Sequence, residues 1–291
     1  MAQELTGIIG GTGLSESLSE QIRDGKYRDV STPYGRPSES ILVGIIGKRR
    51  IAFLNRHGRG HKLSPGEVPY AANIFALKKI GCRTVLATCA AGSLRQSIRP
   101  GELVIVDQFI DKTFRRQSSF FAGYGAAHCE MSQPVCGRLS GRIAAAARKL
   151  RFRTHAKATY VCMEGPQFST RAESLMHRKW GGDLIGMTAM PEAKLAREAQ
   201  MCYALIAIVS DYDCWRPQGK RVDKQKLLRE IIGNMKRAGA NCLSLIEKIL
   251  QGGEAIASEE CGCRRSLDLA VWTDRKMITA TQQRKVAVLF E

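Results

Sequence analysis

The chain has 291 residues, of which 44% are hydrophobic and 25% are charged, and it carries a formal net charge of +18. This composition is that of an ordinary soluble globular protein. No apolar run is long enough to span a bilayer, and the opening residues, MAQELTGIIGG, lack the features of a signal peptide, so we expect a cytoplasmic protein without membrane contact.

Strand-like segments rich in Val, Ile and Leu recur along the chain, with little alternation of polar residues, as in strands buried on both faces. They cover residues 5–10, 40–46, 50–56, 83–89, 102–110, 158–164, 183–188 and 202–210. Helical patterns lie between them, near residues 68–80, 136–150, 170–180, 190–200 and 223–250. This alternation predicts a single α/β domain with a largely parallel or mixed sheet. The polar tail is expected to form a separate flap or terminal helix.

The loop after the first strand, IIGGTGL, brings three glycines and Thr12 to the end of a strand, where backbone N–H groups can approach an anion. It is neither a dinucleotide fingerprint nor a Walker loop, and a plain turn explains it equally well. The stretch TCAAGSLR, residues 88–95, has similar small residues, which fit either a ligand or tight packing.

The loop NRHGRGHK supplies Arg56 and His57, whose side chains can bind a phosphate oxyanion. His57 and His61 have the spacing of helical metal ligands, but Gly58 and Gly60 argue against a helix there. Phosphate therefore fits this loop better than a metal does.

Basic residues concentrate in residues 136–157, which contain no acid. A polyanion partner is one explanation. The segment reads as an amphipathic helix with an Ala-rich face and lacks interleaved aromatic residues for base stacking, so a solvated helix face is favoured over a nucleic-acid site. The positive charge of the chain can still attract a small anionic substrate.

Ten cysteines are scattered along the chain, and none forms a CxxC pair, which argues against a zinc ribbon. Only Cys261 and Cys263 are close together, in ECGCRR. Reduced thiols are the favoured interpretation, and a structural or redox-active CxC disulfide is the alternative.

The strand at residues 202–210 runs directly into DYDCW, which places Asp211 and Asp213 two residues apart. Alternate residues of an extended strand point to the same side, so both carboxyl groups are expected to face one spot. The repulsion between them raises the apparent pKa of the pair.

The order of GGTGL, RHGRGH, AGSLR…PGELVIVDQFIDKT, MEGPQFSTRAES, GMTAMPEAKLAREA and DYDCW closely resembles that of the S-methyl-5′-thioadenosine phosphorylases, in the trimeric purine nucleoside phosphorylase superfamily. The resemblance implies a homotrimer of single α/β domains, each with a mixed, partly barrel-like sheet flanked by helices over residues 1–252. Residues 253–291 look like a C-terminal extension that packs on the same domain or on a neighbouring subunit.

The resemblance also implies a reaction of methionine and purine salvage, in which orthophosphate attacks C1′ of methylthioadenosine and releases adenine and 5-methylthioribose 1-phosphate. No cofactor or metal is implied. One aspartate of the pair then donates a proton to N7 and the other accepts from the N6 amine, which favours adenine over 6-oxo purines. The alternatives are a phosphorylase acting on adenosine or methylthioinosine and, more remotely, a basic nucleic-acid-binding protein.

The matched positions take roles by the same resemblance. The phosphate site would comprise Thr12, Arg56, His57, Cys89, Ala90, Ser169 and Thr188. Phe168 would lie beside the purine and Met187 under the ribose, although ordinary core packing is the alternative for both. His128, Lys224 and Leu227 would form the pocket for the 5′ group, with His128 contributed across a subunit boundary.

Two of these positions depart from the family pattern. Cys89 stands where a threonine or serine often touches phosphate, and a thiol is a weaker donor than a hydroxyl. Lys224 stands where the family has an apolar residue in the methylthio pocket. Its stem can pack while the ammonium reaches solvent, which is the favoured interpretation, or the 5′ group can be polar or anionic. Leu227 keeps the apolar character of the pocket.

Overall fold

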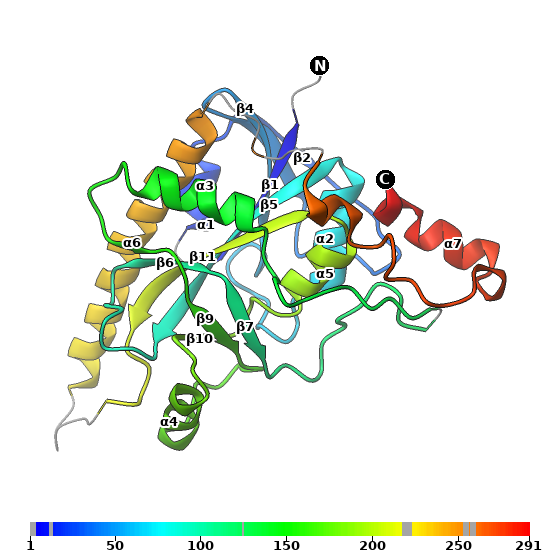
Figure 1. Cartoon of the computed structure of the whole chain (residues 1–291). Helices are drawn as coiled ribbons and strands as arrows, with labels where there is room; N and C mark the ends of the chain where they lie inside the picture. The colour runs from blue at the N-terminus through cyan, green and yellow to red at the C-terminus, as the bar shows by residue number, and fades with distance from the viewer. Residues whose placement is uncertain (1–3, 12–13, 124, 217–222, 253–255, 257–259) are drawn as a thin grey trace.

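The computed structural model describes residues 4–11, 14–123, 125–216, 223–252, 256 and 260–291 (Figure 1). These residues form a mixed α/β domain built on one sheet of eleven strands with helices against both faces. The predicted fold class is confirmed, with one refinement: the strand pairings of the described residues do not close the sheet into a barrel.

Most predicted strands are present at nearly the predicted positions. They are β1 (Leu5–Gly10), β3 (Ile41–Ile46), β4 (Arg49–Asn55), β5 (Cys82–Ser93), β9 (Thr159–Cys162), β10 (Leu184–Gly186) and β11 (Cys202–Asp211). The sequence gives no apolar signal for β2 (Arg23–Arg28), because all six of its residues are exposed at the edge of the sheet.

The segment predicted as one strand at residues 102–110 is two strands, β6 (Leu103–Val106) and β7 (Gln108–Asp111). The break lies at Asp107, whose side chain accepts a hydrogen bond from the backbone N–H of Ala158 at 2.9 Å. β6 pairs with β11 and with the short β8 (Thr154–His155), whereas β7 pairs with β9. The two apolar stretches on either side of Asp107 and Gln108 therefore belong to two different parts of the sheet.

The long strand β5 lies at the centre of the sheet. It runs parallel to β1 on one side and to β11 on the other, and its last residues pair with β10. β4 runs parallel to β1, so the carboxyl ends of β1, β4, β5 and β11 meet at one edge. In open α/β sheets, ligands bind at such an edge.

All five predicted helices are present. They are α2 (Tyr70–Lys79), α3 (Gly137–Ala147), α4 (Arg171–Lys179), α5 (Glu192–Glu198) and α6 (Lys224–Gln251), and the structure adds the short α1 (Ser15–Ser19). Helices α2 and α5 pack on one face, and α3 and α6 pack on the other (Figure 1).

Burial on both faces explains why the strands lack polar alternation. Two hydrophobic cores result, the first between the sheet and helices α2 and α5, and the second between the sheet and helices α3 and α6. In β11, Tyr203 and Leu205 belong to the first core, whereas Ala204 and Ile206 belong to the second. Helix α3 buries Leu139, Ile143 and Ala147 and leaves Arg148 and Lys149 exposed after its end. The basic segment thus has the amphipathic pattern that favours a solvated face.

The C-terminal segment, residues 260–291, packs against its own chain. It contains three short 3₁₀ helices, η1 (Gly262–Arg265), η2 (Arg275–Met277) and η3 (Ala287–Phe290), and helix α7 (Ala280–Val286). Leu267 and Leu289 are buried in the first core, and the Gln200 side chain donates to the Leu289 carbonyl at 2.9 Å. The division of the chain at residue 252 stays a prediction. None of the described helices has the length and apolar character needed to cross a bilayer.

A buried carboxyl group at the end of α5 makes the stability of the fold depend on pH. Burial raises the pKa of Glu198 from 4.5 to about 7, against the opposing effect of a hydrogen bond from the Phe120 N–H at 2.7 Å. The folded state therefore binds this proton more tightly than the unfolded chain does. The stability that this contributes is complete below pH 4.5 and is lost as pH rises through about 7.

We expect Glu198→Gln to remove the pH-dependent loss of folding free energy, which amounts to at most about 3 kcal/mol. The Tm of the wild-type protein should fall more than that of the variant between pH 4.5 and pH 7. Glu230→Gln, at an exposed position of α6, is the matched control and should follow the wild type. Parallel pH profiles for all three proteins would contradict the assignment.

Candidate active site

A cavity of about 690 Å³, here called the main cavity, opens at the edge where the parallel strands end. It gathers predicted site residues from five segments of the chain: Arg56, His57, Cys89, Ala90, Phe168, Ser169, Met187, Thr188, Asp211 and Asp213. Gly11 also lines it, and the adjacent Thr12 lies outside the described residues.

Arg56 follows β4 and is completely buried. Its Nε and Nη2 atoms donate to the two carboxylate oxygens of Glu192 at 2.7 and 2.8 Å, and its Nη1 donates to the Thr88 carbonyl at 2.7 Å. Burial alone would lower the pKa of Arg56, but the Glu192 carboxylate reverses this effect and the pKa is raised. Arg56 is therefore a fixed cation on the cavity wall.

Glycine at position 11 allows the first loop to approach this cation. A Cβ atom at Gly11 would lie 2.7 Å from the Thr88 carbonyl oxygen and 3.0 Å from Nη1 of Arg56. Any side chain there would push β5 and the guanidinium away from the loop. The glycine predicted for close backbone approach thus has a specific packing reason.

His57 is neutral near pH 7, because burial lowers its pKa to about 4. Its Nδ1 lies 2.8 Å from the Leu63 carbonyl oxygen, and since a carbonyl only accepts, Nδ1 carries the proton. The other ring nitrogen, Nε2, is then a hydrogen-bond acceptor. His61 stacks on the same ring with 4.2 Å between the centroids.

The two aspartates reach the cavity by a different geometry from the one predicted. Strand β11 ends at Asp211, and Asp213 lies in a turn with a left-handed φ of 50°. The backbone N–H of Asp213 donates to Oδ1 of Asp211 at 2.6 Å, which fixes the turn. The side chains therefore converge through this turn, and not through the alternation of an extended strand.

The two carboxyl groups have different surroundings. Asp211 accepts hydrogen bonds at both oxygens, from the Asp213 N–H and from the Ser210 hydroxyl at 2.6 Å. The pKa of Asp213 is raised, first by burial and also by the charge of Asp211, while the nearby Ser174 and Ser169 hydroxyls oppose the shift. Oδ2 of Asp213 is buried without a hydrogen-bond partner in the described part of the chain. Asp213 is thus the carboxyl group placed to hold a proton.

Gly92 supplies the floor beneath this pair. It lies opposite Asp211 in the pairing of β5 and β11. A Cβ atom at position 92 would lie 3.1 Å from Oδ1 of Asp211 and 3.3 Å from Cβ of Asp213. The small residues at the end of β5 therefore serve the cavity, which was one of the two interpretations of this stretch.

A buried arginine, to which sequence reasoning gave no role, fixes the backbone around Met187. Arg116 donates from Nη1 to the carbonyls of Met187 and Met190, both at 2.6 Å. It also pairs with the Glu164 carboxylate at 3.0 Å through Nε. No local motif marks Arg116, because its partners are far away in the sequence.

The remaining predicted residues differ in exposure. Phe168 is 86% exposed in the single chain, so it lies at the cavity rim and not in the core. Cys89 is buried, and burial raises the pKa of its thiol to about 12, which keeps it neutral. Thr188 is buried on the cavity wall.

Helix α6 contributes an apolar wall through Leu228, Ile231 and Met235, which share one helix face. The predicted Leu227 is not among the lining residues and is 38% exposed. Lys224 is the first residue of α6, and its side chain lies outside the described part of the structure.

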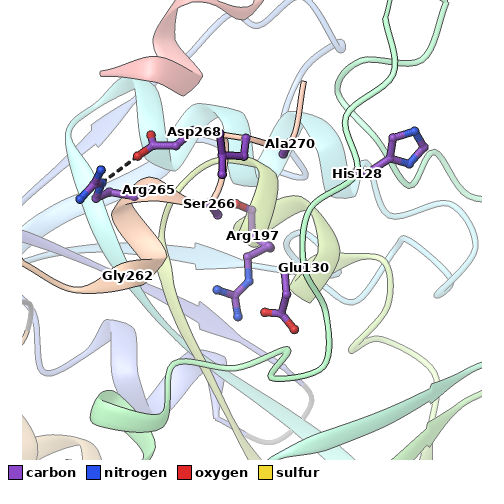
Figure 2. Close-up of a pocket in the computed structure, with 9 residues that line it drawn as sticks. His128, Glu130, Arg197, Gly262, Arg265, Ser266, Asp268 and Ala270 are labelled. Atoms are coloured by element: carbon purple, nitrogen blue, oxygen red, sulfur yellow. Dashed lines mark hydrogen bonds and ion pairs between the residues drawn. The ribbon is translucent and has the colours of Figure 1, made fainter. Parts of the chain in front are cut away.

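His128 lies away from the main cavity. It borders a second cavity of about 500 Å³, here called the C-terminal cavity, between residues 128–130, Arg197 and the C-terminal segment (Figure 2). Its backbone N–H donates to the Ala270 carbonyl at 2.8 Å, and its ring meets that of Trp272 edge to face. Within one chain, the structure does not bring His128 to the aspartates.

Comparison with known proteins gives one consistent result. Residues 6–251 match the phosphorylase superfamily. The S-methyl-5′-thioadenosine phosphorylase of Cereibacter sphaeroides is 46% identical over 269 residues, covering 92% of this chain and 91% of the relative.

Solved structures agree with this result. A methylthioadenosine phosphorylase from an Antarctic soil metagenomic library has a TM-score of 0.88 and 40% identity, over 100% of this chain and 99% of the other. A mutant adenosine/methylthioadenosine phosphorylase from Schistosoma mansoni, in complex with methylthioadenosine, has a TM-score of 0.76 and 35% identity, over 85% and 90% of the two chains.

The buried ion pair predicts a large effect of a conservative substitution. Glu192→Gln leaves the buried Arg56 charge without its counter-ion and should lower the free energy of unfolding by about 3 kcal/mol, measured by denaturant titration. Tyr203→Phe is the matched control, because it removes only the 2.9 Å hydrogen bond from the Tyr203 hydroxyl to Glu192 and should cost about 1 kcal/mol. Equal losses in the two variants would show that the charge of Glu192 is unimportant.

Proposed function

This chain belongs to the phosphorylase superfamily, and we propose that it catalyses the reversible phosphorolysis of S-methyl-5′-thioadenosine, with orthophosphate as co-substrate, to adenine and 5-methylthioribose 1-phosphate. The observation that carries the proposal is the convergence of Asp211 and Asp213 on a cavity whose wall also includes Arg56 and His57. The cavity thus offers a proton donor for a nucleobase and a cation for an oxyanion.

The phosphate end of the cavity comprises Arg56, His57, Thr188 and Gly11. Arg56, held by Glu192, supplies a fixed positive charge to the incoming dianion. His57 accepts a hydrogen bond from a protonated phosphate oxygen at Nε2, because its Nδ1 proton is bound to Leu63. The bound phosphate oxygens then stabilise the positive charge that builds up on the ribose as the C–N bond breaks.

The purine end comprises Asp211, Asp213 and Phe168. Asp213, with its raised pKa and its unpartnered oxygen, donates a proton to N7 of the leaving adenine. Asp211 remains the acceptor and binds the exocyclic N6 amine. Phe168 stacks on the ring at the cavity rim.

The sugar lies between these ends, over Met187, whose position is fixed by Arg116. The apolar face of α6, with Leu228, Ile231 and Met235, suits a methylthio group better than a hydroxyl group, because it offers no hydrogen-bond partner to a polar 5′ substituent.

The proposal includes a cytoplasmic homotrimer in which His128 of one subunit completes the 5′ pocket of another. The position of His128 outside the main cavity of its own chain and the exposure of Phe168 in a single chain both support this arrangement. Ser169, Cys89 and Ala90 complete the phosphate surroundings. No cofactor or metal takes part in the proposed reaction.

The acid role of Asp213 is tested by Asp213→Asn, which keeps the size of the side chain but cannot release a proton. We expect kcat for methylthioadenosine to fall by about two to four orders of magnitude, typical of lost acid catalysis. On an N7-methylated analogue, whose purine already carries the positive charge, the loss should be much smaller. Equal losses on both substrates, at unchanged Tm, would contradict the role.

Substrate specificity is tested by a phosphate-dependent ultraviolet assay of methylthioadenosine, adenosine and methylthioinosine. We expect kcat/KM to be highest for methylthioadenosine and to fall by at least about tenfold for each competitor. Asp211→Asn should narrow the gap between methylthioadenosine and methylthioinosine, because an amide can donate to a 6-oxo group. Faster turnover of methylthioinosine by the wild-type protein would refute the proposal.

A further inference from the structure

Four cysteines from three separate segments lie together, and they are here called the thiol cluster. Cys136 precedes α3, Cys202 begins β11, and Cys261 and Cys263 belong to the C-terminal segment at η1. Their Sγ atoms all lie within 4.8 Å of one another, and those of Cys136 and Cys261 are 3.7 Å apart. All four are free thiols in the structure.

The spacing of the thiol cluster matches a tetrahedral tetrathiolate site. Zinc–sulfur bonds of about 2.3 Å place the sulfur atoms of a regular tetrahedron about 3.8 Å apart. The Cys136–Cys261 distance already has this value, and no other pair has to approach by more than about 1 Å. A disulfide between Cys136 and Cys261 would require their sulfur atoms to approach by about 1.7 Å.

The surroundings of the thiol cluster also suit a metal. Cys136, Cys202 and Cys263 are buried and pack within the core formed by α3 and α6, where water does not compete for the ligands. A zinc ion with four thiolates carries a net charge of −2, which needs compensation in such a place.

Two arginines provide this compensation. Nη1 of Arg197 lies 3.8 Å from Sγ of Cys263, and Arg197 extends between residue 130 and the turn at Gly262 (Figure 2). The Arg138 side chain lies against Cys202 and Cys261. The Nε and Nη2 atoms of Arg138 are buried and have no hydrogen-bond partner among the described atoms. Negatively charged sulfur would satisfy both donors.

We propose that Cys136, Cys202, Cys261 and Cys263 bind one Zn²⁺ ion in a closed structural site that fastens the C-terminal segment to the start of α3 and β11. Each thiol releases one proton on binding, so that four S–H groups and Zn²⁺ give one tetrathiolate and four protons, with no change of oxidation state. With four protein ligands, the site has no open position for substrate and acts on stability alone.

The sequence hides this site because its ligands are not arranged as paired CxxC motifs. Only the fold brings the CxC pair to Cys136 and Cys202. The expectation that the protein has no metal site rested on the search for closely spaced cysteine pairs. Such a search misses ligands that are 59 residues or more apart in the sequence, such as Cys202 and Cys261.

The test uses the full-length protein, purified without chelator, and measures its metal content by inductively coupled plasma mass spectrometry. We expect one zinc per chain in the wild type and a large loss of zinc, with a lower Tm, in Cys261→Ser. Cys129→Ser is the matched control, because Cys129 is a half-buried free thiol outside the thiol cluster, and it should retain the zinc. Cobalt substitution should give the visible absorption of a tetrahedral tetrathiolate.

Alkylation of the denatured protein in chelator, without reductant, separates the remaining outcomes. Ten modified cysteines together with stoichiometric zinc support the proposal. Fewer than ten would show that the thiol cluster forms disulfides, which overturns it. Ten modified cysteines in a protein that binds neither zinc nor cobalt would also overturn it, and so would stoichiometric iron in place of zinc.

Discussion

The completely buried ion pair between Arg56 and Glu192 is the constraint on which the site depends. Through it, the end of β4 is tied to the start of α5, while the Thr88 carbonyl and the Tyr203 hydroxyl connect the same pair to β5 and β11. These contacts hold β4, α5, β5 and β11 in fixed positions relative to one another at the edge of the sheet where the cavity opens. A pair this deeply buried contributes little net stability, because desolvation offsets most of the attraction, but it fixes position. An attacking oxyanion needs a cation that does not reorganise during the reaction.

At the other end of the cavity, the aspartate pair requires two carboxyl groups to lie close together. Two carboxylates at close range repel, and the structure relieves this by giving them unequal surroundings. Asp211 has its charge stabilised by two hydrogen bonds, whereas burial favours the neutral form of Asp213. The left-handed turn at Asp213 brings the acids together, and the absence of a side chain at Gly92 leaves room for them. Adenine presents an acceptor at N7 beside a donor at N6, which is the complement of one protonated and one ionised carboxyl group.

Much of the fold could be predicted from the sequence, because strands buried on both faces have strong apolar runs and the helices have clear amphipathic patterns. The residues of β2 are exposed and therefore carry no such apolar signal. At Asp107, the short polar interruption of the predicted strand did not by itself reveal that the chain changes its pairing partner there. Residues at strand ends could be assigned to the cavity from their motifs and from family resemblance. Glu192, Arg116 and the α6 face could not, since their roles depend on partners distant in sequence. Leu227 illustrates the limit, because a shift of one residue on a helix turns a side chain by about 100°.

The charges of the site itself do not explain how a phosphate dianion enters it. The positive charge of Arg56 is balanced by Glu192, His57 is neutral, and Asp211 adds a negative charge, so the cavity interior has no local excess of positive charge. The attraction must therefore come from farther away. The exposed Lys62 and Glu67 both line the cavity and offset each other, whereas the chain as a whole carries a net charge of +18. A cavity without excess charge inside a basic protein attracts the anion but does not bind the product phosphate ester too tightly for release. The strongly basic composition then has a role that needs no nucleic-acid partner.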